Sequence, residues 1–273
     1  MIFCGTWVAF TTLYTKLEHG QIIEALFFVI DLAFKKSKCN YISVYQKSAS
    51  WTNNPRGSTF KFDQDSLKDS IRFLLLNSYF SIGSLCFHQT IGVPIGVDCG
   101  PDIANLSLFY YEYLYITSLI RSNYKRALRY NGCFRLMDDI SCLNLDGVFL
   151  EDISSIYPSS LQLKKENVGN QTANILDLTI TLNDSCDGFN YKLFDKRDSF
   201  KFNIVNYPDI CGNIAASCAY GVVKSELLRY AKRSSNFLEF THRKSLFLKK
   251  VLEKGYDLDR INSIGDAIDF MRY

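Results

Sequence analysis

The chain has 273 residues, enough to bury a large core in one domain or in a domain with a smaller appendage. Hydrophobic residues make up 47% and charged residues 22%, which excludes a disordered chain. The formal net charge of +3 is too small to indicate an anionic partner by itself. Nine cysteines without a Cys-x-x-Cys pair argue against structural zinc and indicate reduced thiols, so we expect an intracellular protein, nuclear or cytoplasmic.

Two segments without formal charge raise the question of a membrane segment. Residues 1–15 have no basic stretch before the apolar part and are interrupted by Thr11. Residues 73–97 contain Asn77 and Pro94, which the middle of a membrane helix would not carry. We therefore expect no secretory signal and no membrane span, and nothing in the sequence indicates a protein partner.

The first half of the chain alternates between helical and extended patterns. Apolar spacing and turn residues predict, in order, a helix at 16–39, a hairpin region at 40–63, a helix beginning within 64–84, a glycine-rich turn at 92–100 and a long helix from Pro101 to about residue 121. Asp65 and Ser66 are the candidate N-caps of the second helix.

The second half begins with two apolar runs, 133–137 and 140–143, which flank Asp138-Asp139 and predict a strand, a tight turn and a strand. Short strands are expected at 174–182 and 189–194. From about Tyr220 the chain is predicted to be helical and basic. Between Lys224 and Lys254 it carries nine Lys or Arg against three Glu, so this segment has a charge of +6.

The acidic pair Asp138-Asp139 has two interpretations. Asp is a favoured turn residue, and a turn alone explains the pair. Alternatively, carboxylates at the tip of a rigid hairpin can hold two metal ions about 4 Å apart for phosphoryl transfer. A second feature, the segment Gly92–Leu106, combines glycines that allow close backbone approach with a proline at a helix start. By itself this segment is a weak signal.

In this order the features resemble the palm of a reverse transcriptase. The segment Gly92–Leu106 resembles the family's Gly-x-Pro-x-Gly…Pro-x-x-Ala-Asn-Leu motif, and Phe134–Ile140 resembles its catalytic aromatic-x-Asp-Asp hairpin. The runs Leu161–Asn167 and Ile175–Leu178 resemble the next palm motifs, and Tyr191–Asp198 lies where the family has its primer grip. Each motif is modest, but the ordered set is specific and favours the metal-site interpretation of the acidic pair.

The resemblance implies a mixed α/β (α+β) fold. Residues 1–205 would form a right-hand polymerase palm, in which helices 16–39 and 101–121 cover one face of an antiparallel sheet. Residues 206–273 would form a basic helical thumb, because Tyr220–Ala231 resembles a thumb segment of mobile-element proteins. The implied function is RNA-directed DNA polymerisation in a eukaryotic mobile element, and the branch it most resembles is the Penelope-like retroelements. The implied partners are an RNA or DNA template with its primer and deoxynucleotide triphosphates.

The resemblance also assigns roles to individual residues. Asp138 and Asp139 would be the catalytic ligands of Mg²⁺ or Mn²⁺, and Tyr14 would be the aromatic gate that favours deoxynucleotides. The remaining candidates would contact nucleotide, template or duplex: Gly96, Pro101, Asn105, Lys164, Lys165, Lys249, Lys250 and Lys254. Of these, Lys164 and Lys165 could protonate the leaving pyrophosphate, or they could form a solvated basic strand end.

The sequence departs from the family at a critical position. The run Ala9–Thr15 matches the first palm motif, but Ala9 stands where the family has its metal-bridging Asp. Ile95 and Leu136 also replace common residues, and the chain starts almost at this motif, so we expect the fingers to be largely absent. These departures predict a truncated or decayed copy, or an incomplete gene model. The alternative to a polymerase is a catalytically inactive nucleic-acid-binding remnant.

Overall fold

A computed structural model describes residues 5–143, 147–168, 171–183, 188–202, 204 and 207–268. The described residues form two compact units. One comprises Val8–Lys165, and the other comprises the described residues from Glu166 onward together with residues 5–7. In the described ranges no helix is long and apolar enough to cross a membrane.

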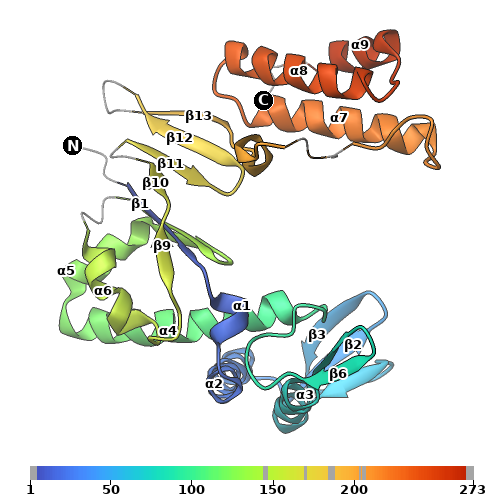
Figure 1. Cartoon of the computed structure of the whole chain (residues 1–273). Helices are drawn as coiled ribbons and strands as arrows, with labels where there is room; N and C mark the ends of the chain where they lie inside the picture. The colour runs from blue at the N-terminus through green and yellow to red at the C-terminus, as the bar shows by residue number, and fades with distance from the viewer. Residues whose placement is uncertain are drawn as a thin grey trace. The chain divides into compact units, whose positions relative to one another are not determined.

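The first unit is built on a four-stranded sheet with the strand order β7-β8-β1-β9. The strands are β7 (Cys133–Leu136), β8 (Asp139–Leu143), β1 (Gly5–Phe10) and β9 (Leu163–Lys165). Strands β7 and β8 form an antiparallel hairpin, and β1 pairs antiparallel with β9 (Figure 1). The start of the chain therefore lies in the middle of this sheet, between segments that are distant in sequence.

The two faces of this sheet differ in burial. Val8 and Phe10 on β1 and Ile140 on β8 are buried, whereas Ala9 and Asp139, their neighbours in sequence, are only half-buried. Because successive strand residues point to opposite faces, one face packs into the core. The other face is open at the level of Ala9 and Asp139, whereas Trp7, further back on the same side of β1, is buried. Ala9 and Asp139 belong to the open face.

The long helix α4 (Gly100–Ser122) covers the core face. Its residues Ile103, Ala104 and Leu108 join the same buried cluster as Phe10 and Ile140. Apolar burial of this kind is the main stabilising contribution to such a unit. Helix α2 (His19–Ser37) packs against α4.

Further elements lie around these two helices. Figure 1 shows α5 and α6 towards one end of α4, and α3 with the small strands towards the other. Their bounds are α1 (Leu13–Lys16), β2 (Tyr41–Tyr45), β3 (Ser48–Thr52), β4 (Phe60–Phe62), α3 (Gln64–Leu76), β5 (Tyr79–Ile82), β6 (Leu85–His88), α5 (Tyr124–Arg129), a 3₁₀ turn (Tyr130–Gly132) and α6 (Val148–Ile156). Strands β3-β2-β4 form one sheet, and β5 with β6 forms a hairpin.

The second unit combines a sheet with three helices. Its elements are β10 (Asn167–Val168), β11 (Thr172–Ile175), β12 (Leu178–Leu182), β13 (Phe189–Leu193), a 3₁₀ turn (Lys196–Ser199), α7 (Ala216–Lys232), α8 (Phe237–Leu252) and α9 (Leu258–Asp266). Leu193 of β13 is buried in one cluster with Leu227, Phe247 and Ile261 of the helices. The sheet and the helices therefore share a core.

The predicted mixed α/β fold with antiparallel sheets and flanking helices is confirmed. One local prediction was right in part, since Ser66 but not Asp65 takes part in the cap of α3, and one was wrong. The N-cap of α3 is Asp63, whose carboxylate accepts from the Ser66 backbone at 2.8 Å, while the Ser66 hydroxyl accepts from the Asp63 backbone. The predicted strand at 174–182 is two strands joined by a turn, because Leu176 adopts a left-handed φ of 54°.

The boundary between the compact units lies after Lys165. The sequence placed the palm–thumb boundary after residue 205, which is outside the described residues. The difference arises because Leu193 of β13 shares a core with the C-terminal helices, a packing that local sequence patterns do not report. The functional division into palm and thumb stays a prediction.

Gly92 packs closely against α1 and the residue that follows it, just before α2 begins. Its φ is 86°, its N–H donates to the Leu17 carbonyl at 2.7 Å, and a Cβ placed on it would lie 2.5 Å from the Tyr14 carbonyl oxygen. We expect Gly92→Ala to destabilise the protein by about 1–3 kcal/mol in chemical denaturation, from left-handed strain and overpacking. Gly96→Ala is the control, since no atom lies within 4 Å of that Cβ. Equal losses of stability in the two variants would contradict the close approach of the Gly92 backbone to the Tyr14 carbonyl.

Candidate functional site

Asp138 and Asp139 lie at the tip of the β7–β8 hairpin. Leu136 pairs with Asp139, so Met137 and Asp138 form a two-residue turn. Met137 has a φ of 57°, a left-handed conformation that two-residue hairpin turns require and that a residue with a side chain adopts at some cost. The predicted hairpin is confirmed, and it presents Asp139 on the open face of the sheet.

Ala9 lies beside this hairpin. The backbone N–H of Phe10 donates to the Asp138 carbonyl at 2.9 Å, so β1 passes the hairpin tip at the level of residues 9 and 10. The alignment of Ala9 with the first palm motif requires this proximity, and the structure meets the requirement. On the other side of β1, Ala9 is paired directly with Lys164 of β9.

A largely but not fully buried guanidinium anchors the hairpin to α4. Arg135 donates from Nε and Nη2 to the two carboxylate oxygens of Glu112, and from Nη1 to the Asn105 side-chain oxygen at 2.6 Å and the Met137 carbonyl at 3.2 Å. Tyr157 donates to the same Glu112 carboxylate at 2.8 Å, and burial raises the Tyr157 pKa well above its usual range. Paired and hydrogen-bonded charges of this kind hold a fixed geometry. Asn105 thus supports the hairpin through Arg135.

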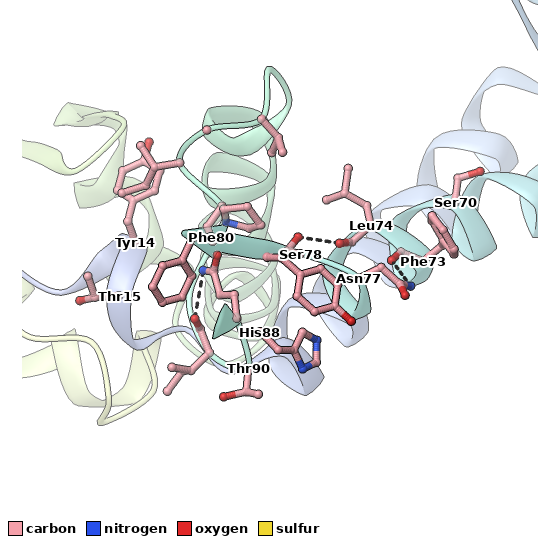
Figure 2. A pocket seen from close by; sticks show the side chains of 18 of the residues that line it. Tyr14, Thr15, Ser70, Phe73, Leu74, Asn77, Ser78, Phe80, His88 and Thr90 are labelled. Atoms are coloured by element: carbon pink, nitrogen blue, oxygen red, sulfur yellow. Dashed lines mark hydrogen bonds between the residues drawn. The ribbon is translucent and has the colours of Figure 1, made fainter. Parts of the chain in front are cut away.

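Tyr14 lines a cavity of about 1330 Å³ in the same unit. Figure 2 shows Tyr14 and Thr15 facing this space together with side chains from α3 and the β5–β6 hairpin, among them Phe73 and Phe80. Gly96 also lines it. Desolvation raises the Tyr14 pKa, and the negative charge of Asp138 raises it further. Tyr14 is therefore within electrostatic reach of the hairpin tip.

The other predicted site residues lie elsewhere. Pro101 is exposed in the first turn of α4, and Lys165 is exposed on β9, where it pairs with Val8. Neither lines the cavity. The three C-terminal candidates, Lys249, Lys250 and Lys254, belong to the second unit, at and just beyond the end of α8.

The residues at the hairpin do not fit a pair of divalent cations. Two-metal sites need carboxylates that bridge and separate the ions. Here Asp138 and Asp139 are adjacent, the expected bridging position is the methyl group of Ala9, and the residue opposite it is the cation Lys164. Within the described ranges, no group of three or more His, Cys, Asp or Glu could hold a metal ion.

Proteins of similar structure occur among the solved structures. No family model and no curated protein matches this chain. Telomerase from Candida albicans, in complex with a TWJ fragment of telomeric RNA, aligns with a TM-score of 0.50 at 11% identity, over 85% of this chain and 35% of that one. Apo telomerase from Candida tropicalis aligns with a TM-score of 0.46 at 12% identity, over 84% and 36%.

The fold is similar to that of telomerase. At these identities the likeness concerns the fold alone, and this chain spans about a third of each telomerase chain. It agrees with the reverse-transcriptase type of fold that the motif order implies.

Sequence reasoning missed the anchor of the hairpin. Arg135 is a lone charge within an apolar strand run, and Glu112 is a lone acid in the apolar middle of α4. A charge embedded in apolar sequence usually has a partner when it is buried. That signal could have flagged each residue, but it could not have paired them.

Loss of this anchor should destabilise the first unit. Glu112→Gln leaves the Arg135 guanidinium, whose side chain is 11% exposed, without its counter-charge, and we expect a loss of about 3 kcal/mol. Asp69→Asn is the matched control, because it removes an ion pair with Arg72 that is exposed on both sides and should cost below about 0.5 kcal/mol. Similar losses for the two variants, measured by urea unfolding, would show that the anchor contributes little.

The coupling between Tyr14 and the hairpin is also measurable. An anion near a phenol disfavours the phenolate, so removing the charge in Asp138→Asn should lower the Tyr14 pKa. Desolvation remains in the variant, so the pKa should stay above the usual value for tyrosine. A pH titration by NMR of labelled tyrosine, assigned with Tyr14→Phe, measures this shift. An unchanged pKa would mean that Asp138 points away from the cavity.

Proposed function

We propose that this chain is a reverse-transcriptase-type palm and thumb that binds primer–template nucleic acid and has lost efficient nucleotidyl transfer. The ordered motifs and the telomerase-like fold support the family, and the observation that carries the loss of activity is Ala9 beside Asp138. The motif set also favours descent from a eukaryotic mobile element, nearest to the Penelope-like branch. Losing a well-placed charge costs on the order of 10² to 10³ in rate, and more when a metal ion is lost with it.

We assign nucleic-acid binding to the basic helices of the second unit. Arg229 and Arg233 pair with Asp177, and Arg243 pairs with Asp198, so these cations serve the unit's own structure. The lysines at the end of α8 differ from these arginines in their pairing.

Lys249 and Lys250 are exposed, and no ion pair of these two or of Lys254 occurs among the residues described. Cations in the last turn of a helix also offset its carbonyl ends, which alone could explain two of the three lysines. Exposed cations without a protein partner are suited to phosphate contacts, which make nucleic-acid binding salt-dependent.

The second candidate is an active RNA-directed DNA polymerase that uses Mg²⁺ or Mn²⁺ and deoxynucleotide triphosphates. Tyr14 favours it, because an aromatic ring at the edge of the cavity would exclude a ribose 2′-hydroxyl. In that case an acidic residue elsewhere in the chain would have to supply the third carboxylate, because position 9 is an alanine. The two candidates predict opposite results for primer extension.

Binding of a primer–template duplex tests the role assigned to these lysines. Replacing Lys249, Lys250 and Lys254 together with Gln should flatten the dependence of log affinity on log salt, by about one unit of slope for each lost phosphate contact. Fluorescence anisotropy with a labelled primer–template duplex measures the slope. Lys35→Gln with Lys36→Gln, at the exposed end of α2, is the control for a general change of charge. If the triple variant keeps the slope of the unmodified chain, the end of α8 is only a solvated surface.

Primer extension tests the loss of activity. We expect the unmodified chain to extend a primer on an RNA template no faster than Asp138→Asn, because the bridging carboxylate is absent in both. Incorporation of labelled deoxynucleotide, with either Mg²⁺ or Mn²⁺, is the measurement. Robust extension by the unmodified chain that Asp138→Asn abolishes would establish the polymerase instead.

A further inference from the structure

Lys164 occupies an unusual place relative to the acidic hairpin. It is the direct cross-strand partner of Ala9 in the antiparallel β1–β9 pair. Directly opposite residues of such a pair project from the same face, with Cβ atoms about 4.5–5.5 Å apart. Lys164 is exposed, as expected for the open face to which Ala9 belongs.

Asp139 lies on that same open face, on the other side of β1. The sheet order places β1 between β8 and β9, and the Phe10–Asp138 hydrogen bond sets the hairpin tip level with Ala9. Two strand spacings separate β8 from β9, roughly 10 Å. Between Asp139 and Lys164 the strand β1 contributes only the methyl group of Ala9, over which the flexible lysine stem can extend.

We propose that the Lys164 ammonium is a built-in counter-ion of the Asp138-Asp139 carboxylates, and that it opposes binding of a divalent cation to this open face. The proposal rests on the alignment of Ala9 used in the proposed function, and it gives Lys164 a role different from proton donation. A resident positive charge repels an approaching dication and competes with it for the same carboxylates. The alanine at position 9 and the cation opposite it then both disfavour the binding of a divalent cation.

The proposal has a consequence for Ala9→Asp. A carboxylate placed at position 9 would lie beside Lys164, where an opposite-charge cross-strand pair is favourable. The new carboxylate would therefore be partly neutralised, and its gain in metal affinity would be small while Lys164 is present. The effects of changing the two residues should be coupled, not additive.

Mn²⁺ binding in the absence of nucleic acid tests this coupling. Calorimetry or electron paramagnetic resonance would be applied to the unmodified chain, Lys164→Met, Ala9→Asp and the double variant. We expect Lys164→Met to raise Mn²⁺ affinity by on the order of tenfold, a size typical of one charge near a protein surface. We also expect Ala9→Asp to gain about tenfold more affinity in the Lys164→Met background than in the unmodified one.

Lys165→Met is the matched control. It removes the same charge from the same strand, but Lys165 pairs with Val8 and projects from the opposite face. It should change Mn²⁺ affinity less than about twofold, since its charge faces away from the carboxylates. Circular dichroism checks that each variant keeps its fold.

Two results would overturn the proposal. One is an equal effect of Lys164→Met and Lys165→Met, which would reduce Lys164 to a solvated strand end. The other is the same affinity gain from Ala9→Asp in both backgrounds. Neither result depends on duplex binding or primer extension, so a failure here is distinguishable from a failure of the proposed function.

Discussion

The position of β1 in the centre of the first sheet is the constraint on which the site depends. A single hydrogen bond, from the Phe10 N–H to the Asp138 carbonyl, and the pairing of β1 with β9 bring three distant segments of the chain to one level. Because strand residues alternate between faces, this level also fixes which side chains share the open face. A slip of one residue in β1 would turn Ala9 into the core and Phe10 out of it.

The open face therefore carries the Asp139 carboxylate, a methyl group and an ammonium in neighbouring positions across three strands, with Asp138 in the turn beside them. In a polymerase palm the middle position would need a further carboxylate to balance two dications. Here the charges can balance without any metal ion. Arg135 and Glu112 keep the hairpin attached to α4 independently of that chemistry, so the hairpin keeps its place whether or not a metal ion binds.

Part of this site was predictable from sequence because it depends on local patterns. Apolar runs around Asp138-Asp139 predicted the hairpin, and helical spacing with Pro101 predicted α4. Asp63 was missed as a cap because Asp65 and Ser66 carry the same cap chemistry two and three residues later, and Ser66 does take part in the cap.

What the sequence could not predict is pairing between distant elements. The register that sets Lys164 opposite Ala9 joins residues from the two ends of the first unit, and local periodicity contains no information about it. The same holds for the Arg135–Glu112 pair and for the core shared by β13 and the C-terminal helices. These features depend on tertiary packing, which decides register wherever one face of a sheet is buried.

The central claim is that this palm-type scaffold binds nucleic acid without assembling a two-metal site. The most direct test is anomalous X-ray diffraction from crystals of the unmodified chain grown with a primer–template duplex and Mn²⁺. The account predicts electron density for the duplex and no pair of manganese peaks at Asp138 and Asp139. Two anomalous peaks about 4 Å apart at these carboxylates would contradict it.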